Sequence, residues 1–463
     1  MTKLNEDCLI LIFNNLQDSL YSCLFVNKDW CNVVIPILWK NYSWYINDNE
    51  LEKKLFTTIL CCLSSSSKQL LSDNNIILPS TILLNIPLFN YISFCKFPKI
   101  EITNKIIKMV LENNFNNFEK RNLLEQEIYK LFVSQCKDIK ELQWKTLQPL
   151  SLFPGALTCF SQLHSLNIDI YPLNSNVLYE MSQICKNLNS LSIQNFSKDS
   201  PGLISLIDTQ RNLKKVYLYD IIKKGNCKEL NKALARKANT INYLYLANKI
   251  FKQTPLFLES LVNLKWLTIF NINSYSERYN GNVKELLAIS EFPHLEHLRI
   301  SHLSCFKEIS LLIEKTKGKI LDIYIYISKL DNFIENTGML IKSISNNCPK
   351  IKLLYTYISQ NDFFHVKSLL LNCRYLEEIR LGSIYSSYTE FIGDELLDIL
   401  TKFSSKSLTK VTIGKWRCSI DALKRFFESY RGRTLSYFEI PYHYQSFISK
   451  YINEGVIVET FKF

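Results

Sequence analysis

Residues 213–218 read Leu-Lys-Lys-Val-Tyr-Leu, an apolar residue followed three and five positions later by two more. The same spacing recurs along most of the chain, and neighbouring units begin between 23 residues apart (Ile241 to Leu264) and 32 residues apart (Leu376 to Leu408). The units are Ile139-Leu142-Trp144, Leu163-Leu166-Ile168, Leu188-Leu191-Ile193, Leu213-Val216-Leu218, Ile241-Leu244-Leu246, Leu264-Leu267-Ile269, Leu295-Leu298-Ile300, Ile320-Ile323-Ile325, the weaker Ile351-Leu354, Leu376-Ile379-Leu381, Leu408-Val411-Ile413, Leu435-Phe438-Ile440 and Val458-Phe461-Phe463. The chain is therefore a tandem repeat.

The spacing predicts one strand and one helix in each unit. The second and third apolar residues are two positions apart, so on a strand both point to the same, inward side. Residues 176–186, 282–290 and 393–403 show the helical periodicity expected after such strands. Stacked units of this kind predict an α/β fold, a curved solenoid with parallel strands on its concave face and helices on its convex face.

Cysteine stands three residues before the first apolar position in four units, as Cys136, Cys185, Cys348 and Cys373. The unit length is close to the period of about 20–29 residues known for leucine-rich repeats. With these cysteines, the chain resembles the cysteine-containing leucine-rich repeats, in an irregular form.

A different pattern occupies the first forty residues. Apolar residues at three- and four-residue steps, from Leu9 to Leu16, predict a short helix that Asn5 caps. Helices over residues 18–26, capped by Asp18, and over about 28–36 follow. So small a unit is below the size at which a separate core is normally stable. Its apolar residues therefore face a partner, or the three helices pack on the rest of the chain.

The order of these apolar residues resembles an F-box, the three-helix motif that docks on a Skp-type adaptor, itself bound to a cullin. The resemblance implies an adaptor-binding set of ten residues: Leu4, Leu9, Phe13, Leu16, Leu20, Val26, Trp30, Pro36, Leu38 and Trp39. Two positions depart from the family pattern, with Asn5 in place of proline and Asn27 in place of cysteine.

Three domains are predicted: an F-box-like helical domain over 1–45, a helical linker with irregular first repeats over 46–135, and the solenoid over 136–463. In the linker, apolar periodicity predicts helices over 51–63 and 121–136. The serine run from Ser64 to Ser67 predicts a loop.

Composition bounds the environment of the chain. It has 463 residues, 47% of them hydrophobic, which is enough for a sizeable core. Its longest apolar stretch, 76–94, is interrupted by prolines and asparagines, so we expect no membrane span. The first residues show no basic leader, and we expect its 14 cysteines to be thiols in the cytoplasm or nucleus.

The formal net charge is +12, and much of it lies between residues 402 and 433. That segment contains nine Lys or Arg residues but only Asp421 and Glu428 as acids. A solvated rim of charged helix ends explains this pattern, and an anionic partner such as nucleic acid is the alternative.

No motif for catalysis or metal binding is present in the sequence. The eleven glycines lie too far apart for a phosphate-binding loop or a nucleophile elbow. His294, His297 and His302 form a cluster without acidic or thiol ligands at convincing spacing, so they are expected to be ordinary strand and loop residues. We expect no catalytic residue, no metal and no cofactor, and hence a protein that is not an enzyme.

Residues that alternate with the inward leucines are expected to face the concavity, and many of them are aromatic. The predicted target-binding set is Tyr217, Tyr219, Tyr243, Tyr245, Trp266, Phe270, His297, Arg299, Tyr324, Tyr326, Tyr355, Tyr357 and Arg380, with Glu378 beside Arg380. Such a stripe is typical of a binding face. It also follows from the strand propensity of tyrosine, with rings packed on one another. A glycan or a single-stranded nucleic acid would fit its chemistry, although no sequence motif supports either.

The sequence thus predicts a substrate-recognition subunit of a Skp–cullin–F-box ubiquitin ligase, whose F-box binds the adaptor and whose repeats bind a protein target. A leucine-rich-repeat scaffold without ligase partners is the principal alternative. A nucleic-acid binder is a third.

Overall fold

The computed structural model describes residues 5–16, 20–41, 48–84, 87–112, 115–171, 173–196, 198–219, 227–248, 256–271, 281–327, 335–383, 391–414, 416–439 and 444–460. The chain forms two compact units. The first comprises Met1–Ser192 with Ser200–Asn212, and the second comprises Ile193–Asp199 with Leu213–Phe463. The predicted domain boundaries after residues 45 and 135 remain predictions.

The three N-terminal helices are α1 (Glu6–Asn15), α2 (Leu20–Cys23) and α3 (Lys28–Asn41). Asn5 caps α1 as predicted, because its side chain accepts a hydrogen bond from the backbone N–H of Asp7. The third helix is longer than predicted and continues through Pro36 to Asn41. Proline removes one helical hydrogen bond, but Ile37, which follows it, is buried in the three-helix core and holds the last turns in place.

Further helices lead to the repeats: α4 (Asn49–Cys61), α5 (Ser65–Asp73), α6 (Ser80–Leu84), η1 (Tyr91–Phe94), α7 (Ile100–Leu111) and α8 (Phe118–Gln135). The predicted helices over 51–63 and 121–136 are confirmed as α4 and α8, with small shifts at their ends. The prediction of a loop over Ser64 to Ser67 is wrong. Ser64 accepts a hydrogen bond from the backbone N–H of Ser67, at 3.0 Å, and so starts α5 where composition alone indicated a loop.

The repeats build one parallel sheet in chain order within the described residues. Its strands are β1 (Glu141–Trp144), β2 (Ser165–Asp169), β3 (Ser190–Gln194), β4 (Lys215–Tyr219), β5 (Tyr243–Asn248), β6 (Trp266–Asn271), β7 (His297–Ser301), β8 (Asp322–Tyr326), β9 (Leu353–Ile358), β10 (Glu378–Ser383), β11 (Lys410–Thr412), β12 (Leu435–Glu439) and β13 (Ile457–Thr460). Every predicted unit contributes one of these strands.

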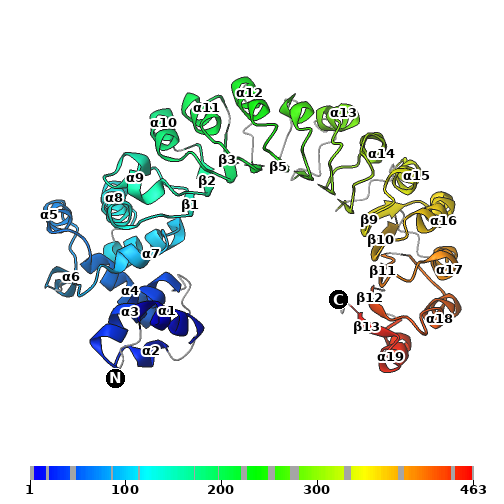
Figure 1. Cartoon of the computed structure of the whole chain (residues 1–463), viewed down its shortest axis with the longest axis horizontal. Coiled ribbons are helices and arrows are strands. Elements are labelled where there is room, and N and C mark those ends of the chain that lie inside the picture. The colour runs from blue at the N-terminus through cyan, green and yellow to red at the C-terminus, as the bar shows by residue number, and fades with distance from the viewer. Residues whose placement is uncertain are drawn as a thin grey trace. The chain divides into compact units, whose positions relative to one another are not determined.

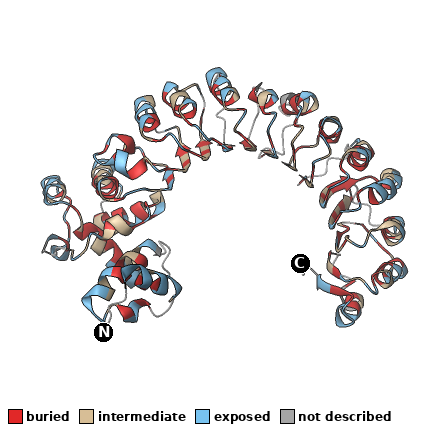
Figure 2. Cartoon of the chain, in the orientation of Figure 1, coloured by how far each residue is buried: buried red, intermediate tan, exposed pale blue. Residues whose placement is uncertain are grey.

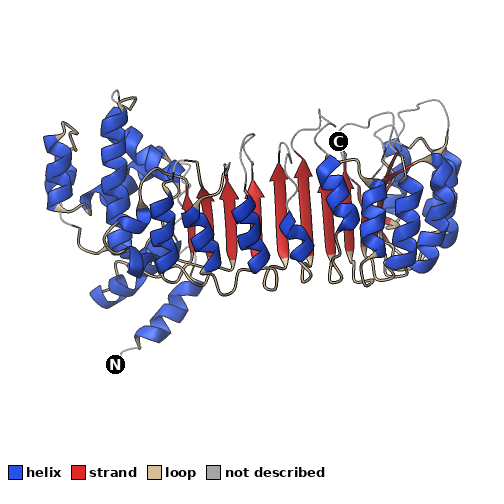
Figure 3. Cartoon of the chain, turned by 90° about the horizontal axis from the view of Figure 1, so that it is seen from above, coloured by secondary structure: helices blue, strands red, loops and turns tan. Residues whose placement is uncertain are grey.

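Between the strands lie η3 (Leu150–Leu152), α9 (Ala156–Phe160), α10 (Ser175–Ile184), α11 (Pro201–Asp208), α12 (Lys228–Arg236), η4 (Leu256–Ser260), α13 (Gly281–Ile289), α14 (Phe306–Glu314), α15 (Thr337–Asn347), η6 (Gln360–Asp362), α16 (Phe363–Asn372), α17 (Gly393–Phe403), α18 (Ile420–Glu428) and α19 (Gln445–Asn453). In the second unit the strands line the inner side of the curve and the helices its outer side (Figure 1). The strands run side by side in one direction (Figure 3). The predicted leucine-rich-repeat fold class is confirmed.

The core lies between each strand and its helices (Figure 2). The predicted inward residues from Leu142 to Phe438 are buried, and so are the four repeat cysteines. Ile440 lies outside the described residues. The last unit is an exception. There Ile457, 1% exposed, faces inward opposite Leu435, and Val458 is 58% exposed, so the predicted phase was wrong by one residue. Phe461 and Phe463 lie outside the described residues.

Neighbouring repeats cap each other's helices. The carboxylate of Asp199 accepts the backbone N–H groups of Glu229 and Leu230 in α12, both at 2.9 Å. Asp362 likewise accepts the N–H of Gly338 in α15 at 3.0 Å. A carboxylate at the positive end of a helix satisfies donors that the helix itself leaves unpaired.

The same device operates in the first unit, where Ser175 Oγ accepts the N–H of Gly202 at 2.8 Å. A Cβ on Gly202 would lie 1.9 Å from the carbonyl oxygen of Ser175. Glycine is therefore what permits this close approach of two helix starts.

Candidate protein-binding surfaces

The three N-terminal helices enclose a small core of their own. Its buried members are Leu9, Phe13, Leu20, Cys23, Val33, Val34 and Ile37. Leu16, Trp30 and Leu38 are partly buried against it. Phe13 and Trp30 meet edge to face, with ring centroids 5.0 Å apart.

The predicted adaptor-binding residues are therefore divided. Six of them, Leu9, Phe13, Leu16, Leu20, Trp30 and Leu38, hold the three helices together. Trp39 packs on Tyr91 of η1, with ring centroids 4.6 Å apart, and Pro36 is half-buried within α3. Val26 is exposed, and Leu4 lies outside the described residues. Whether these residues contact an adaptor remains a prediction.

A set of apolar side chains remains exposed on α1, on α2 and in the turn that follows α2, and we call it the N-terminal apolar surface. It comprises Leu11, Ile12, Tyr21, Phe25 and Val26, of which Phe25 is 88% exposed. Leu11, Tyr21 and Phe25 were not predicted as binding residues. The prediction placed the binding residues on the periodic apolar face, and most of that face forms the three-helix core. Large apolar residues off that face were the available signal.

Aromatic side chains stack across the strands of the second unit. Trp266 on β6 lies between Tyr243 on β5, at 5.6 Å between centroids, and His297 on β7, at 4.0 Å. The three are register neighbours, Tyr243 opposite Trp266 and Trp266 opposite His297. The Nδ1 atom of His297 bonds to the carboxylate of Asp322 on β8. The predicted stripe is thus a continuous packed row.

A second row lies two residues further along each strand. Each member is the register partner of the next, in the order Tyr217, Tyr245, Thr268, Arg299, Tyr324, Tyr355 and Arg380. Tyr217 and Tyr245 lie 6.0 Å apart between centroids, and Tyr324 and Tyr355 meet edge to face at 4.6 Å. Burial, together with the neighbouring Tyr243, raises the pKa of Tyr217 to about 12. Its phenol is therefore an O–H group at neutral pH.

A third row lies at the ends of the strands. It contains Tyr219, Phe270 and Tyr326, and the ring of His302 lies edge-on to Phe270 and to Tyr326, at 5.1 Å from each. Tyr357 differs from the prediction for this row. It is only 6% exposed, because it packs on Gly382 and its hydroxyl donates to the carbonyl of Ile327 at 3.0 Å. Its role is therefore structural, and it presents almost no surface to a ligand.

The C-terminal part of the second unit carries a charged cluster. Arg380 donates to Glu378 at 2.6 Å and lies 4.0 Å from Glu439 on β12. Lys410 lies 4.0 Å from Glu378, and the hydroxyl of Tyr437 donates to Glu439 at 3.2 Å. Opposite charges are therefore matched within this cluster.

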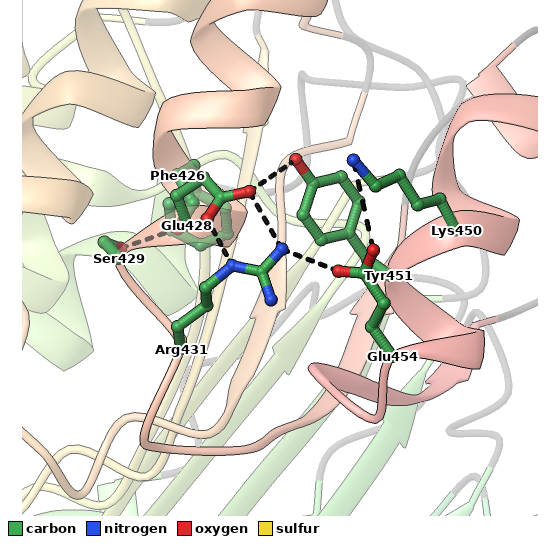
Figure 4. Close-up of polar contacts among 7 residues, drawn as sticks. All are labelled: Phe426, Glu428, Ser429, Arg431, Lys450, Tyr451 and Glu454. Atoms are coloured by element: carbon green, nitrogen blue, oxygen red, sulfur yellow. Dashed lines mark hydrogen bonds and ion pairs between the residues drawn. The ribbon is translucent and has the colours of Figure 1, made fainter.

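The basic segment over 402–433 is largely engaged in contacts within the chain. Arg431 bonds to Glu428 at the end of α18 and to Glu454, 2.6 Å away, at the end of α19 (Figure 4). Glu428 also accepts a hydrogen bond from Tyr451 at 3.1 Å, so one guanidinium links the last two helices. Arg425 pairs with Asp398 at 3.2 Å. These contacts support the interpretation of this segment as a rim of charged helix ends.

Within the described ranges, no group of His, Cys, Asp and Glu residues is arranged to hold a metal ion. His294 bonds to Lys319, at 2.9 Å, while His297 and His302 belong to the aromatic rows. None of the helices in the described part of the chain is both long and apolar enough to cross a membrane.

No protein-family model and no curated protein matches the chain. Among solved structures, the crystal structure of the Rad7 and Elc1 complex from yeast matches with 13% identity and a TM-score of 0.34, over 73% of this chain and 87% of that one. The leucine-rich repeat-containing protein LegL7 from Legionella pneumophila matches with 14% identity and a TM-score of 0.34, over 60% and 96%. The PEPR1–AtPEP1 structure matches with 14% identity and a TM-score of 0.32, over 68% and 47%. The fold assignment rests on the strands and helices of the chain itself.

Proposed function

We propose that this chain is the substrate-recognition subunit of a Skp–cullin–F-box ubiquitin ligase. The observation that carries the proposal is the N-terminal apolar surface. Leu11, Tyr21 and Phe25 stay exposed although the three-helix core beneath them is already filled. Exposed apolar groups of this size on a small helical unit are typical of a protein contact. Together with the resemblance to an F-box, they favour docking of a Skp-type adaptor.

In this proposal the chain does no chemistry. The adaptor and a cullin bind through the N-terminal helices, and the concave rows hold a protein target for ubiquitination. Ubiquitin transfer takes place on other subunits, and this chain raises its rate by holding the target close to the activated ubiquitin. A cytoplasmic or nuclear location follows from that assignment.

A leucine-rich-repeat scaffold without ligase partners is the second candidate. One observation favours it: Trp39 at the end of α3 packs on Tyr91 of η1, so part of the three-helix surface is used within the chain. In that case the N-terminal helices would act as a cap.

The test is co-purification of the full chain with a Skp-type adaptor. Phe25→Asp and Leu11→Asp place a charge on the N-terminal apolar surface without entering its core. Leu157→Asp, on the exposed side of α9, is the matched control. We expect capture by the wild type and by Leu157→Asp, and loss of capture in the other two variants with unchanged thermal unfolding. Absence of capture by the wild type would contradict the ligase assignment and leave the scaffold.

A further inference from the structure

Arg299 on β7 stands apart from the other charged residues of the concave rows. Its side chain is exposed, and among the residues that the structure describes it forms no ion pair with a carboxylate. Asp322, on the neighbouring strand β8, is already engaged with His297, and Glu378 on β10 is engaged with Arg380. Arg299 is therefore a cation whose charge is left for a ligand.

The side chain of Arg299 is held in place before any ligand arrives. Its guanidinium carbon lies 5.0 Å from the centre of the Trp266 ring, a cation–π contact. That indole is itself fixed between Tyr243 and His297. Since a planar guanidinium on an aromatic face has already lost much of its freedom, the cost of ordering it on binding is small.

Two phenols are on the strands that follow this cation in the sheet. Tyr324 lies opposite Arg299 in the register, and Tyr355 follows on β9. Burial raises the pKa of both phenols, so each carries its proton at neutral pH. A guanidinium and a phenolic O–H group are both hydrogen-bond donors, and a carboxylate accepts from both.

We propose that Arg299 is the receptor for an aspartate or glutamate side chain in an acidic, extended segment of the target protein. Tyr324 donates a hydrogen bond beside it, and the rings of Tyr217 and Tyr245 pack against the apolar parts of the segment. This inference rests on the proposed function, in that it takes the concave rows to be the target-binding face.

The charge of the face favours a carboxylate over a phosphate. A phosphate monoester brings a charge of about −1.5 to −2 and is usually held by several cations. Here Arg380 is already paired with Glu378 and Glu439, and the exposed Lys215, the register partner of Tyr243, is on β4, three strands from Arg299. Single-stranded nucleic acid requires a continuous positive groove, which these acids interrupt. A singly charged carboxylate matches one guanidinium.

The experiment uses the purified full chain and a displayed library of random peptides. We expect selected peptides to be rich in Asp and Glu, and their binding to weaken with added salt. For the best synthetic peptide, Arg299→Gln should lower the affinity by about tenfold or more, since it removes a charge-assisted contact. Arg425→Gln is the control, because it removes the same charge from an outer helix, where Arg425 is paired with Asp398.

Several results would overturn the inference. These are an absence of acidic bias among the selected peptides, equal affinity of Arg299→Gln and the wild type, or failure to select any peptide. Tighter binding of the same peptide with phosphoserine in place of its glutamate, or of an oligothymidylate, would replace the carboxylate by another anion. Adaptor capture by Arg299→Gln should stay as in the wild type, so loss of the peptide contact and loss of the ligase assignment are separate outcomes.

Discussion

The ring of Tyr357 on β9 lies against Gly382, its register partner on β10, and a methyl group on that glycine would come 2.7 Å from ring atom Cδ1. The hydroxyl of Tyr357 also donates to the carbonyl of Ile327, which follows β8, and accepts from its N–H at 3.3 Å. One buried side chain thus ties three consecutive repeats together.

Gly382→Ala should displace this ring and lower the stability of the chain by about 1–3 kcal/mol, the usual cost of overpacking. The shift of the thermal unfolding midpoint measures it. Gly414→Ala is the control, because a Cβ at Gly414 meets no atom of the described residues within 4 Å. Equal midpoints for the two variants would mean that Tyr357 adjusts without cost.

Thr356→Val should stabilise the chain. The side chain of Thr356 takes the third inward position of the weak unit that begins at Ile351 and is fully buried. Its hydroxyl has no hydrogen-bond partner among the residues that the structure describes. Replacing it by a methyl group removes a desolvation cost of about 1–3 kcal/mol. Thr337→Val should act in the opposite direction, since the hydroxyl of Thr337 donates to Asp362 at 2.5 Å. Denaturant unfolding of both variants tests the contrast, and a loss of stability in Thr356→Val would refute it.

Asn27→Ala should weaken the start of α3. The side-chain oxygen of Asn27 accepts the backbone N–H of Trp30 at 2.8 Å, a helix cap at the position where F-box proteins have cysteine. Loss of the cap should cost about 1 kcal/mol. Hydrogen exchange of the first amides of α3 measures the effect locally, with Asn32→Ala in the same helix as the control. Unchanged exchange in Asn27→Ala would show that the cap contributes nothing.

Glu125→Gln should change how stability depends on pH. Burial raises the pKa of Glu125 on α8, although Thr146 donates a hydrogen bond to its carboxylate at 2.7 Å. The folded state therefore binds this proton more tightly than the unfolded state, and wild-type stability falls as pH rises from the ordinary carboxyl range through the raised pKa.

Glutamine keeps the acceptor for Thr146 and does not titrate. The variant should be more stable than the wild type at neutral pH, and the difference should shrink in acid. Thermal unfolding across a pH series measures this, with Glu119→Gln on the exposed side of α8 as the control. Parallel curves for Glu125→Gln and the wild type would contradict the prediction.

The repeat pattern predicted the sheet because two buried positions on a strand specify both its place and its phase. The pattern failed at β13, where Val456, Ile457 and Val458 are consecutive and fit either phase. The structure resolves the phase by pairing Ile457 with Leu435. The start of α5 was missed for a different reason, since a serine run has low helix propensity inside a helix but is favourable at its first position.

The members of the concave rows follow from alternation along each strand. Their pairing does not, because it depends on register between strands that are far apart in sequence. The sequence shows Glu378 two residues before Arg380, but it does not show that Glu439 joins this pair or that Arg299 lies over Trp266. Leu11, Tyr21 and Phe25 of the N-terminal apolar surface were missed because periodicity identifies the face that becomes the core.

The caps that neighbouring repeats exchange have an evolutionary consequence. Asp199 caps α12 and Asp362 caps α15, and each of these residues belongs to a different repeat from the helix that it caps. A repeat that is deleted or duplicated as a unit would carry the cap of its neighbour's helix and would be separated from the cap of its own helix. We therefore expect deletion or duplication of a whole repeat to leave a helix start without its cap.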